Sequence, residues 1–318
     1  MRPRLVLLDD YQGVALDMAP WGELTGWDVQ ALREHHDHPD ALVAHLRDAT
    51  AIVAMRERTP FPRSVLEQLP LLRLLITTGP GNAAIDMTAA TDLGIVVCGT
   101  RGSAAAAPEL AWALLMSAAR DIPRQERSLR EGRWQTGLGR ELAGRTLGVV
   151  GLGRIGTRIA AYARAFDMRV IAWSENLTAE RAAAAGAEHV SKRELFERAD
   201  IATLHLRLSE RTHRIIGSPE LHALGPDGLL VNTARGGLVD TEALVEALHA
   251  GTLGGAALDV FDHEPISADD PLLTAPRTVL SPHLGYATRE QYRRYYADAL
   301  EAVGAWERGA PVRVIAAP

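Results

Sequence analysis

Short apolar runs alternate with helical patterns along the whole chain of 318 residues. Apolar runs of roughly four to six residues are typical of strands that a parallel sheet buries on both faces, and the amphipathic segments between them are typical of crossover helices. The pattern therefore predicts an α/β protein built on parallel sheets, and the length allows two domains of ordinary size.

The sequence pattern in the first third of the chain predicts a separate, small α/β unit. Its expected strands lie near residues 5–8, 51–54, 72–76 and 95–97, and its expected helices near residues 41–47, 63–68 and 87–92. A long apolar helix is expected near residues 109–120, followed by a polar stretch, rich in glycine and arginine, that runs to Gly144.

A second unit begins at residues 146–150, where the alternation starts again. Its later strands are expected near residues 169–173, 201–205, 229–232, 255–258 and 278–280. Ser191 and Glu194 have the spacing of a capping box, and Asp240 suits the N-cap of a helix that runs through His249.

The last helix, about residues 289–307, follows the final strand of the second unit. A helix in that place could return to the first unit and complete it. We therefore expect a discontinuous domain of residues 1–100 and 287–318, and a second domain of residues 101–286.

Composition limits the classes of partner. Hydrophobic residues make up 47% and charged residues 23%, as in folded globular proteins, and the net charge of −6 argues against a general nucleic-acid binder. Cys98 is the only cysteine, which excludes an internal disulfide and a thiolate metal cluster. No apolar stretch is long enough for a secretory signal or a membrane span. We expect a cytoplasmic protein without a nucleic-acid partner, a membrane partner or a metal.

A glycine turn, Gly151-Leu152-Gly153-Arg154-Ile155-Gly156, stands between an expected strand and an expected helix at residues 155–166. In a dinucleotide-binding fold the first glycine makes the tight turn, and the second lets the backbone approach the pyrophosphate. The third lets helix and strand pack closely, and the helix N-terminus supplies free N–H groups. The context therefore favours a dinucleotide site over an ordinary βα turn.

The end of the next strand distinguishes NAD from NADP, because an acidic residue there binds the ribose hydroxyls. The usual aspartate position carries Ser174, and the carboxylate comes one residue later, at Glu175. Since no arginine or lysine is adjacent and Glu175 would repel a 2′-phosphate, NAD is predicted and NADP is disfavoured.

Three further motifs follow the glycine turn in order. They are Val231-Asn232-Thr233-Ala234-Arg235-Gly236-Gly237, Leu258-Asp259-Val260-Phe261-Asp262-His263-Glu264-Pro265 and Ser281-Pro282-His283-Leu284-Gly285. With the glycine turn they closely resemble the D-isomer-specific 2-hydroxyacid dehydrogenases, over nearly the whole chain. The resemblance implies two Rossmann-like or flavodoxin-like parallel-sheet domains with a cleft between them, the nucleotide domain being inserted into the substrate domain. It also implies a homodimer that pairs through the nucleotide domain.

Matched motif by motif, the resemblance assigns a catalytic set. The substrate arginine falls on Arg235, the acid/base histidine on His283 and its acidic partner on Glu264. Reduction of a 2-oxo acid needs a hydride at the carbonyl carbon and a proton at its oxygen. A guanidinium can bind the carboxylate and polarise the carbonyl, and an imidazole beside a carboxylate is a suitable proton donor.

The resemblance also implies contacts to the cofactor beyond Gly151, Gly153 and Gly156. Asp259 matches the residue that meets the nicotinamide amide. The remaining expected cofactor contacts are Arg154, Ile155, Ser174, Glu175, His205, Thr233, Ala234, His283 and Gly285.

In the first domain, the turn Thr77-Thr78-Gly79-Pro80-Gly81-Asn82 resembles the family loop whose backbone N–H groups bind the substrate carboxylate. Gly79, Gly81 and Asn82 are therefore expected to bind substrate, together with Arg235 and His283. Pro80 has no N–H to donate, so the anion contact would fall on Gly81 and Asn82. Gly81 also leaves room that could admit a bulkier substrate.

One cluster of histidines, His35, His36 and His38, stands beside Asp37 and invites a metal site. Adjacent ligands in a polar loop would diverge, so a solvated loop is expected instead.

The leading hypothesis is a reversible, NAD-dependent reductase of 2-oxo acids to D-2-hydroxy acids. Two alternatives stay open: a non-catalytic NAD-dependent sensor of the corepressor kind, and a formate or phosphite dehydrogenase on the same scaffold. The identity of the 2-oxo acid and the physiological direction also stay open.

Overall fold

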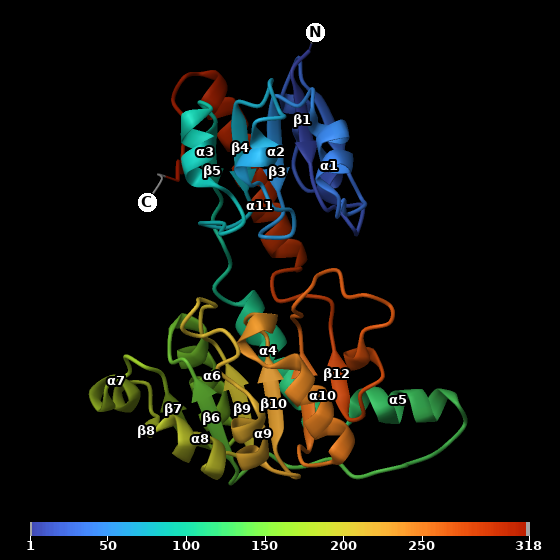
Figure 1. Cartoon of the computed structure of the whole chain (residues 1–318), viewed down its shortest axis with the longest axis vertical. Coiled ribbons are helices and arrows are strands. Elements are labelled where there is room, and N and C mark those ends of the chain that lie inside the picture. The colour runs from blue at the N-terminus through green and yellow to red at the C-terminus, as the bar shows by residue number, and fades with distance from the viewer. Residues whose placement is uncertain (1, 316–318) are drawn as a thin grey trace. The chain divides into compact units, whose positions relative to one another are not determined.

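The computed structural model describes residues 2–315, which form two compact α/β units (Figure 1). Unit 1 comprises Met1–Ser103 and Thr288–Pro318, and unit 2 comprises Ala104–Ala287. Each unit contains one sheet whose strands all run parallel, so the predicted α/β class with two parallel sheets is confirmed.

The sheet of unit 1 has five strands in the order β2-β1-β3-β4-β5, the order of flavodoxin-like sheets. The strands are β1 (Arg4–Leu7), β2 (Asp28–Ala31), β3 (Ala51–Ala54), β4 (Leu74–Thr77) and β5 (Val96–Gly99). The central strands β3 and β4 are buried along their whole length, and their residues are apolar except for Thr77 at the end of β4.

Four α-helices belong to unit 1. They are α1 (Pro39–Leu46), α2 (Arg63–Leu66), α3 (Met87–Asp92) and α11 (Arg289–Glu307), besides the short 3-10 helices η1 (Ala15–Asp17) and η2 (Trp21–Glu23). The first three share a core with alternate strand residues such as Val6, Ile52 and Leu75. Helix α11 contacts β4, so the last helix does return to the first unit, as the sequence predicts.

The sheet of unit 2 has seven strands in the order β12-β11-β10-β9-β6-β7-β8. They are β6 (Thr146–Val150), β7 (Arg169–Trp173), β8 (Glu188–His189), β9 (Ile201–Leu204), β10 (Leu229–Asn232), β11 (Gly255–Leu258) and β12 (Thr278–Leu280). The chain moves outward from β6 to β8 and then returns to place β9 beside β6. This reversal is the topological switch point at which such folds bind their ligands.

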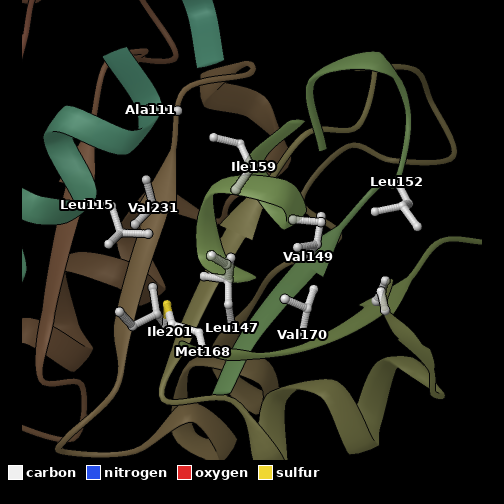
Figure 2. Packing of buried hydrophobic residues seen from close by; sticks show 14 of the residues in the cluster. Ala111, Leu115, Leu147, Val149, Leu152, Ile159, Met168, Val170, Ile201 and Val231 are labelled. Carbon is white, nitrogen blue, oxygen red and sulfur yellow. The ribbon is translucent and has the colours of Figure 1, made fainter. Parts of the chain in front are cut away.

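Helices cover both faces of the second sheet. The helices of unit 2 are α4 (Ala106–Ala119), α5 (Ile122–Arg130), α6 (Arg154–Ala165), α7 (Ala179–Ala184), α8 (Lys192–Arg198), α9 (Ser218–Leu224) and α10 (Thr241–Ala250), with η3 (Gly236–Leu238) and η4 (Pro271–Leu273). Leu147 and Val149 of β6 pack with α4 and α6, as Figure 2 shows, whereas Val150 packs with α8, α9 and α10. The capping box of Ser191 and Glu194 and the N-cap role of Asp240 are confirmed.

Several elements, among them β2, β8, α5 and α9, were not predicted from the sequence. Strands β2 and β8 are sheet edges with exposed or half-exposed side chains, so they lack a buried apolar run. Helix α5 lies in the stretch expected to be irregular, because most of its side chains are polar and Ser128 is its one fully buried residue. No helix within residues 2–315 is both long and apolar enough to span a bilayer.

Candidate active site

The glycine turn joins β6 to α6 at the switch point of unit 2. Gly151 has φ +99°, and a Cβ there would lie 2.9 Å from the backbone of His205, so the tight turn requires glycine. A Cβ on Gly156 would lie 2.2 Å from the carbonyl oxygen of Gly151, so the third glycine permits the close packing of helix and turn.

The turn also leaves space and donors for an anion. No atom lies within 4 Å of the position of a Cβ on Gly153, among the described residues, so the backbone can be approached there. The first bond of the helical ladder runs from the N–H of Thr157 to Gly153, so the N–H groups of Arg154, Ile155 and Gly156 precede the ladder. This cradle fits a dinucleotide pyrophosphate.

Two neighbouring strand ends complete this edge of the sheet. Ser174 and the exposed Glu175 follow β7, and His205 follows β9. The Nε2 atom of His205 lies 3.0 Å from the hydroxyl of Thr203, and burial lowers the pKa of His205 to about 4. His205 is therefore a neutral imidazole near neutral pH.

Arg235 lies in the loop after β10, and this loop packs tightly on the one after β11. Asn232 holds the loop, because its Nδ2 donates to the carbonyl of Arg235 and its Oδ1 accepts from Ala234. A Cβ on Gly236 would lie 2.2 Å from the carbonyl carbon of Phe261, so only glycine lets the two loops approach. This close contact brings Arg235 toward the Glu264 segment.

His283 and Glu264 form a hydrogen-bonded pair within unit 2. The Nδ1 atom of His283 lies 2.5 Å from Oε2 of Glu264, and the N–H of Phe261 donates to Oε1 at 2.9 Å. Burial acts to raise the pKa of Glu264, but the hydrogen bond and charge of His283, with help from Phe261 and Arg235, lower it overall. Glu264 is thus a carboxylate that orients the imidazole of His283.

The turn that carries His283 is held by the buried carboxylate of Asp259. Asp259 accepts the hydroxyl of Ser281 at 2.6 Å and the N–H groups of Leu284 at 2.7 Å and Gly285 at 2.9 Å. His283 itself has φ +51°, a conformation that costs a non-glycine residue energy. Burial raises the pKa of Asp259 against these hydrogen bonds. The clamp therefore fixes a strained histidine in one orientation.

In unit 1, the turn after β4 differs in how its backbone N–H groups are used. The N–H of Gly79 already donates to Thr100 at 2.6 Å, whereas within residues 2–315 the N–H groups of Gly81 and Asn82 donate to nothing. The side chain of Asn82 braces the turn, donating to the carbonyl of Arg56 and to Thr77. Gly81 and Asn82, rather than Gly79, can therefore bind an anion through the backbone.

Sequence reasoning missed a cation beside this turn. Arg56 follows β3 with φ +55°, and its Nη1 donates to the carbonyl of Thr78 at 3.3 Å. A Cβ on Gly79 would lie 1.9 Å from that nitrogen, so the glycine makes room for the guanidinium. The available signal was the position of Arg56 two residues after the buried strand β3, because the carboxyl ends of neighbouring parallel strands share one edge.

Comparison with known proteins agrees with this geometry. Residues 112–285 match the family model described as "D-isomer specific 2-hydroxyacid dehydrogenase, NAD binding domain", which is more than half of the chain. The chain belongs to the D-isomer specific 2-hydroxyacid dehydrogenase family. The family resemblance predicted from the four motifs is confirmed, and with it the membership of a nicotinamide-dependent oxidoreductase family.

Named relatives of this dehydrogenase family differ in their substrates. The glyoxylate reductase of Aeropyrum pernix is 38% identical over 89% of this chain and 88% of its own length. The D-3-phosphoglycerate dehydrogenase of Methanocaldococcus jannaschii is 40% identical over 79% of this chain, which spans about half (48%) of that relative. The structure of a phosphoglycerate oxidoreductase from Vibrio cholerae has a TM-score of 0.92 at 36% identity, covering 97% of this chain and all (100%) of that one.

The histidine cluster of unit 1 is not the solvated loop that we expected. The side chain of His35 is only 10% exposed, with Nδ1 2.9 Å from Asp9 and Nε2 3.2 Å from Asp37. The expectation was wrong for this residue because Asp9, distant in sequence and 2% exposed, supplies a buried partner. No group of three or more possible metal ligands is found within residues 2–315.

Proposed function

We propose that this dehydrogenase reduces a 2-oxo acid to the D-2-hydroxy acid, reversibly, with His283, Glu264 and Arg235 as its catalytic residues. The observation that carries the proposal is the His283–Glu264 pair, held by Asp259 in the same unit as the glycine cradle. A pair of this kind is a proton donor and acceptor, which a protein that only senses NAD would not need.

His283, Glu264 and Arg235 have different roles in the proposed reaction. NAD(H), when bound at the glycine cradle, supplies or takes up the hydride. In reduction, protonated His283 gives its Nε2 proton to the carbonyl oxygen, and Glu264 stabilises the charged imidazole until then. Arg235 presents a planar, permanently charged group to the carboxylate and carbonyl of the substrate, which lysine could not match. In oxidation, neutral His283 takes the hydroxyl proton.

In unit 1, we assign the anion-binding role to the turn after β4. The N–H groups of Gly81 and Asn82 are oriented by the braces from Asn82 to Arg56 and Thr77. The open space at Gly81, where a Cβ would meet no described atom within 4 Å, supports the admission of a substrate with more than a minimal side chain.

The proposed cofactor is NAD(H), with NADP(H) bound less well. The support is the exposed carboxylate of Glu175 directly after Ser174, because a 2′-phosphate beside it would be repelled.

The experiment is to follow nicotinamide absorbance while the purified protein is offered glyoxylate, hydroxypyruvate, a phosphorylated 2-oxo acid and other 2-oxo acids with NADH or NADPH. We expect turnover of at least one acid, and a D-configured product. Tight NADH binding without turnover of any acid would favour the sensor instead. Steady oxidation of formate or phosphite would favour the third hypothesis.

We also propose that the protein is a homodimer that pairs through segment 121–141 of unit 2. This segment exposes Ile122 (53%), Leu129 (56%), Trp134 (76%) and Leu138 (97%), an apolar set that a monomer would leave in water. It borders a cavity of about 800 Å³, lined by Leu138 and Leu229 among others. Trp134→Asp should shift the mass measured by light scattering to that of one chain, and an unchanged mass would contradict the pairing.

A cytoplasmic location is part of the proposal, supported by the single, buried and unpaired Cys98.

A further inference from the structure

The turn after β7 carries charges of both signs at the place where this fold holds the adenosine ribose of a dinucleotide. Ser174 accepts the N–H of Leu177 at its carbonyl, at 3.0 Å, which closes the turn. Ser174 therefore puts a neutral hydroxyl where a carboxylate is usual. No arginine or lysine is adjacent to Ser174 in the sequence.

In the folded protein, a cation from the following helix, Arg181, lies at this turn. Thr178 is the N-cap of α7, and its hydroxyl accepts the N–H of Arg181 at 3.3 Å. The first turn of the helix thus directs Arg181 toward the preceding loop, where its Nη1 donates to the carbonyl of Asn176 at 3.3 Å. Seven positions of sequence separate Arg181 from Ser174, but the folded loop places its guanidinium on the turn itself.

The guanidinium of Arg181 keeps capacity for an anion. Its side chain is exposed, and within residues 2–315 it forms no ion pair with a carboxylate. The neighbouring carboxylate of Glu180 accepts hydrogen bonds from its own backbone N–H and from Thr178, which hold it at the start of the helix. These hydrogen bonds lower the pKa of Glu180. Glu175 is the opposing charge, exposed and likewise without an ion pair in the described part of the chain.

A 2′-phosphate carries a charge of about −1.5 to −2 and three acceptor oxygens, to which a guanidinium can donate two parallel hydrogen bonds. An aspartate at the position of Ser174 would repel it directly, whereas a hydroxyl can donate to it. The turn therefore holds one attractive and one repulsive charge for the same group.

We propose that Arg181 is a specificity-determining residue that, with Ser174, admits the 2′-phosphate of NADP(H), while Glu175 opposes it. The protein then binds both cofactors, with NADH favoured, and the balance between Arg181 and Glu175 sets the ratio. This inference rests on the proposed nicotinamide site and specifies its selectivity.

The test measures dissociation constants for NADH and NADPH, which differ only in the 2′-phosphate, by the fluorescence of the bound nicotinamide without any substrate. We expect native NADPH binding within about tenfold of NADH binding. Arg181→Ala should weaken NADPH by about tenfold and leave NADH unchanged, whereas Glu175→Gln should strengthen NADPH severalfold. Arg181→Lys, which keeps the charge, should retain most of the NADPH affinity.

Arg193→Ala is the matched control, because it removes the same charge from an exposed arginine of α8 that pairs with Glu197. Equal losses in Arg181→Ala and Arg193→Ala, or equal losses for NADH and NADPH, would overturn the proposal, as would a native protein that binds NADH but not NADPH. Failure to bind either cofactor would instead overturn the proposed function.

Discussion

Each unit of the protein contains a histidine hydrogen-bonded through Nδ1 to a carboxylate at an end of its sheet. In unit 1 the pair is His35 and Asp9, at 2.9 Å, and in unit 2 it is His283 and Glu264, at 2.5 Å. Each pair also includes a residue with positive φ, Asp9 at 56° and His283 at 51°. A histidine–carboxylate pair alone therefore does not identify an active site.

The two pairs differ at the second ring nitrogen. The Nε2 atom of His35 is engaged by Asp37 at 3.2 Å, whereas within residues 2–315 no hydrogen bond engages Nε2 of His283. A histidine can exchange a proton with a substrate only through a free nitrogen. We therefore propose a structural role for the pair in unit 1 and an acid/base role for the pair in unit 2.

The largest expected effect is on turnover when each histidine is removed. His283→Ala should lower kcat for 2-oxo acid reduction by about 10²–10⁴-fold, the usual contribution of a general acid, while the NADH dissociation constant stays nearly unchanged. His35→Ala should leave kcat within about threefold, since His35 has no free nitrogen to exchange a proton with substrate. Steady-state kinetics with a cofactor titration checks both, and equal losses of kcat would break the comparison.

A second difference is Arg235, whose guanidinium accompanies the proposed catalytic pair of unit 2. Arg235→Lys keeps the charge but loses the planar fork, so kcat/KM for the 2-oxo acid should fall by roughly 10²-fold at unchanged NADH affinity. Arg214→Lys, at an exposed arginine that lies 3.6 Å from Asp240, is the matched control and should have little effect. A mild effect of Arg235→Lys would mean that only charge matters at this position.

The two histidine–carboxylate pairs should lose their contributions to stability at opposite ends of the pH range. The pair in unit 2 should lose its contribution at the acid end. The pKa of Glu264 is lowered in the folded protein, so its contribution to stability is present above the ordinary glutamate pKa of about 4.3. It is lost as pH falls through the lowered pKa. Denaturant titration should show Glu264→Gln less stable than the native protein by about 1 kcal/mol at neutral pH, a difference that vanishes in acid. A constant difference down to low pH would contradict the pairing.

The smallest expected effect is at the basic end, in unit 1. The hydrogen bond to Asp9 raises the pKa of His35 against burial, with further help from Asp37. Its stabilisation is therefore complete below the ordinary histidine pKa of about 6.5 and is lost as pH rises through the raised pKa. His35→Asn should lower the free energy of unfolding by about 1 kcal/mol in mild acid and by less at alkaline pH. A larger loss at alkaline pH would reverse the assignment.

The fold was largely predictable because its central strands are uninterrupted apolar runs. Strands β3, β6 and β10 begin and end where the sequence predicts, since burial on both faces leaves no ambiguity. The edge strands β2 and β8 were not predicted, because many of their side chains are exposed to solvent and their sequences therefore lack a buried apolar run. Helix α5 was missed for the same reason, as its side chains are mostly polar.

The candidate site was predictable only in part. The resemblance supplied Arg235, Glu264 and His283, and the structure brings the last two into direct contact. The clamp of Asp259 on Ser281 depends on a contact between segments distant in sequence, which local patterns do not connect. The position of Arg181 depends on a local turn at the start of α7, a helix that was not predicted. The same holds for the burial of His35 against Asp9, which turned an apparent surface cluster into a structural pair.

The most direct test of the account is a single turnover. Native protein and His283→Ala, each saturated with NADH, are mixed with an excess of a 2-oxo acid that the native protein accepts, and loss of the reduced nicotinamide is followed by its absorbance. We expect rapid oxidation and a D-2-hydroxy acid product in the native protein, and a rate lower by about 10²-fold or more in the variant. A variant that oxidises bound NADH at the native rate would contradict the assignment of His283 as the proton donor.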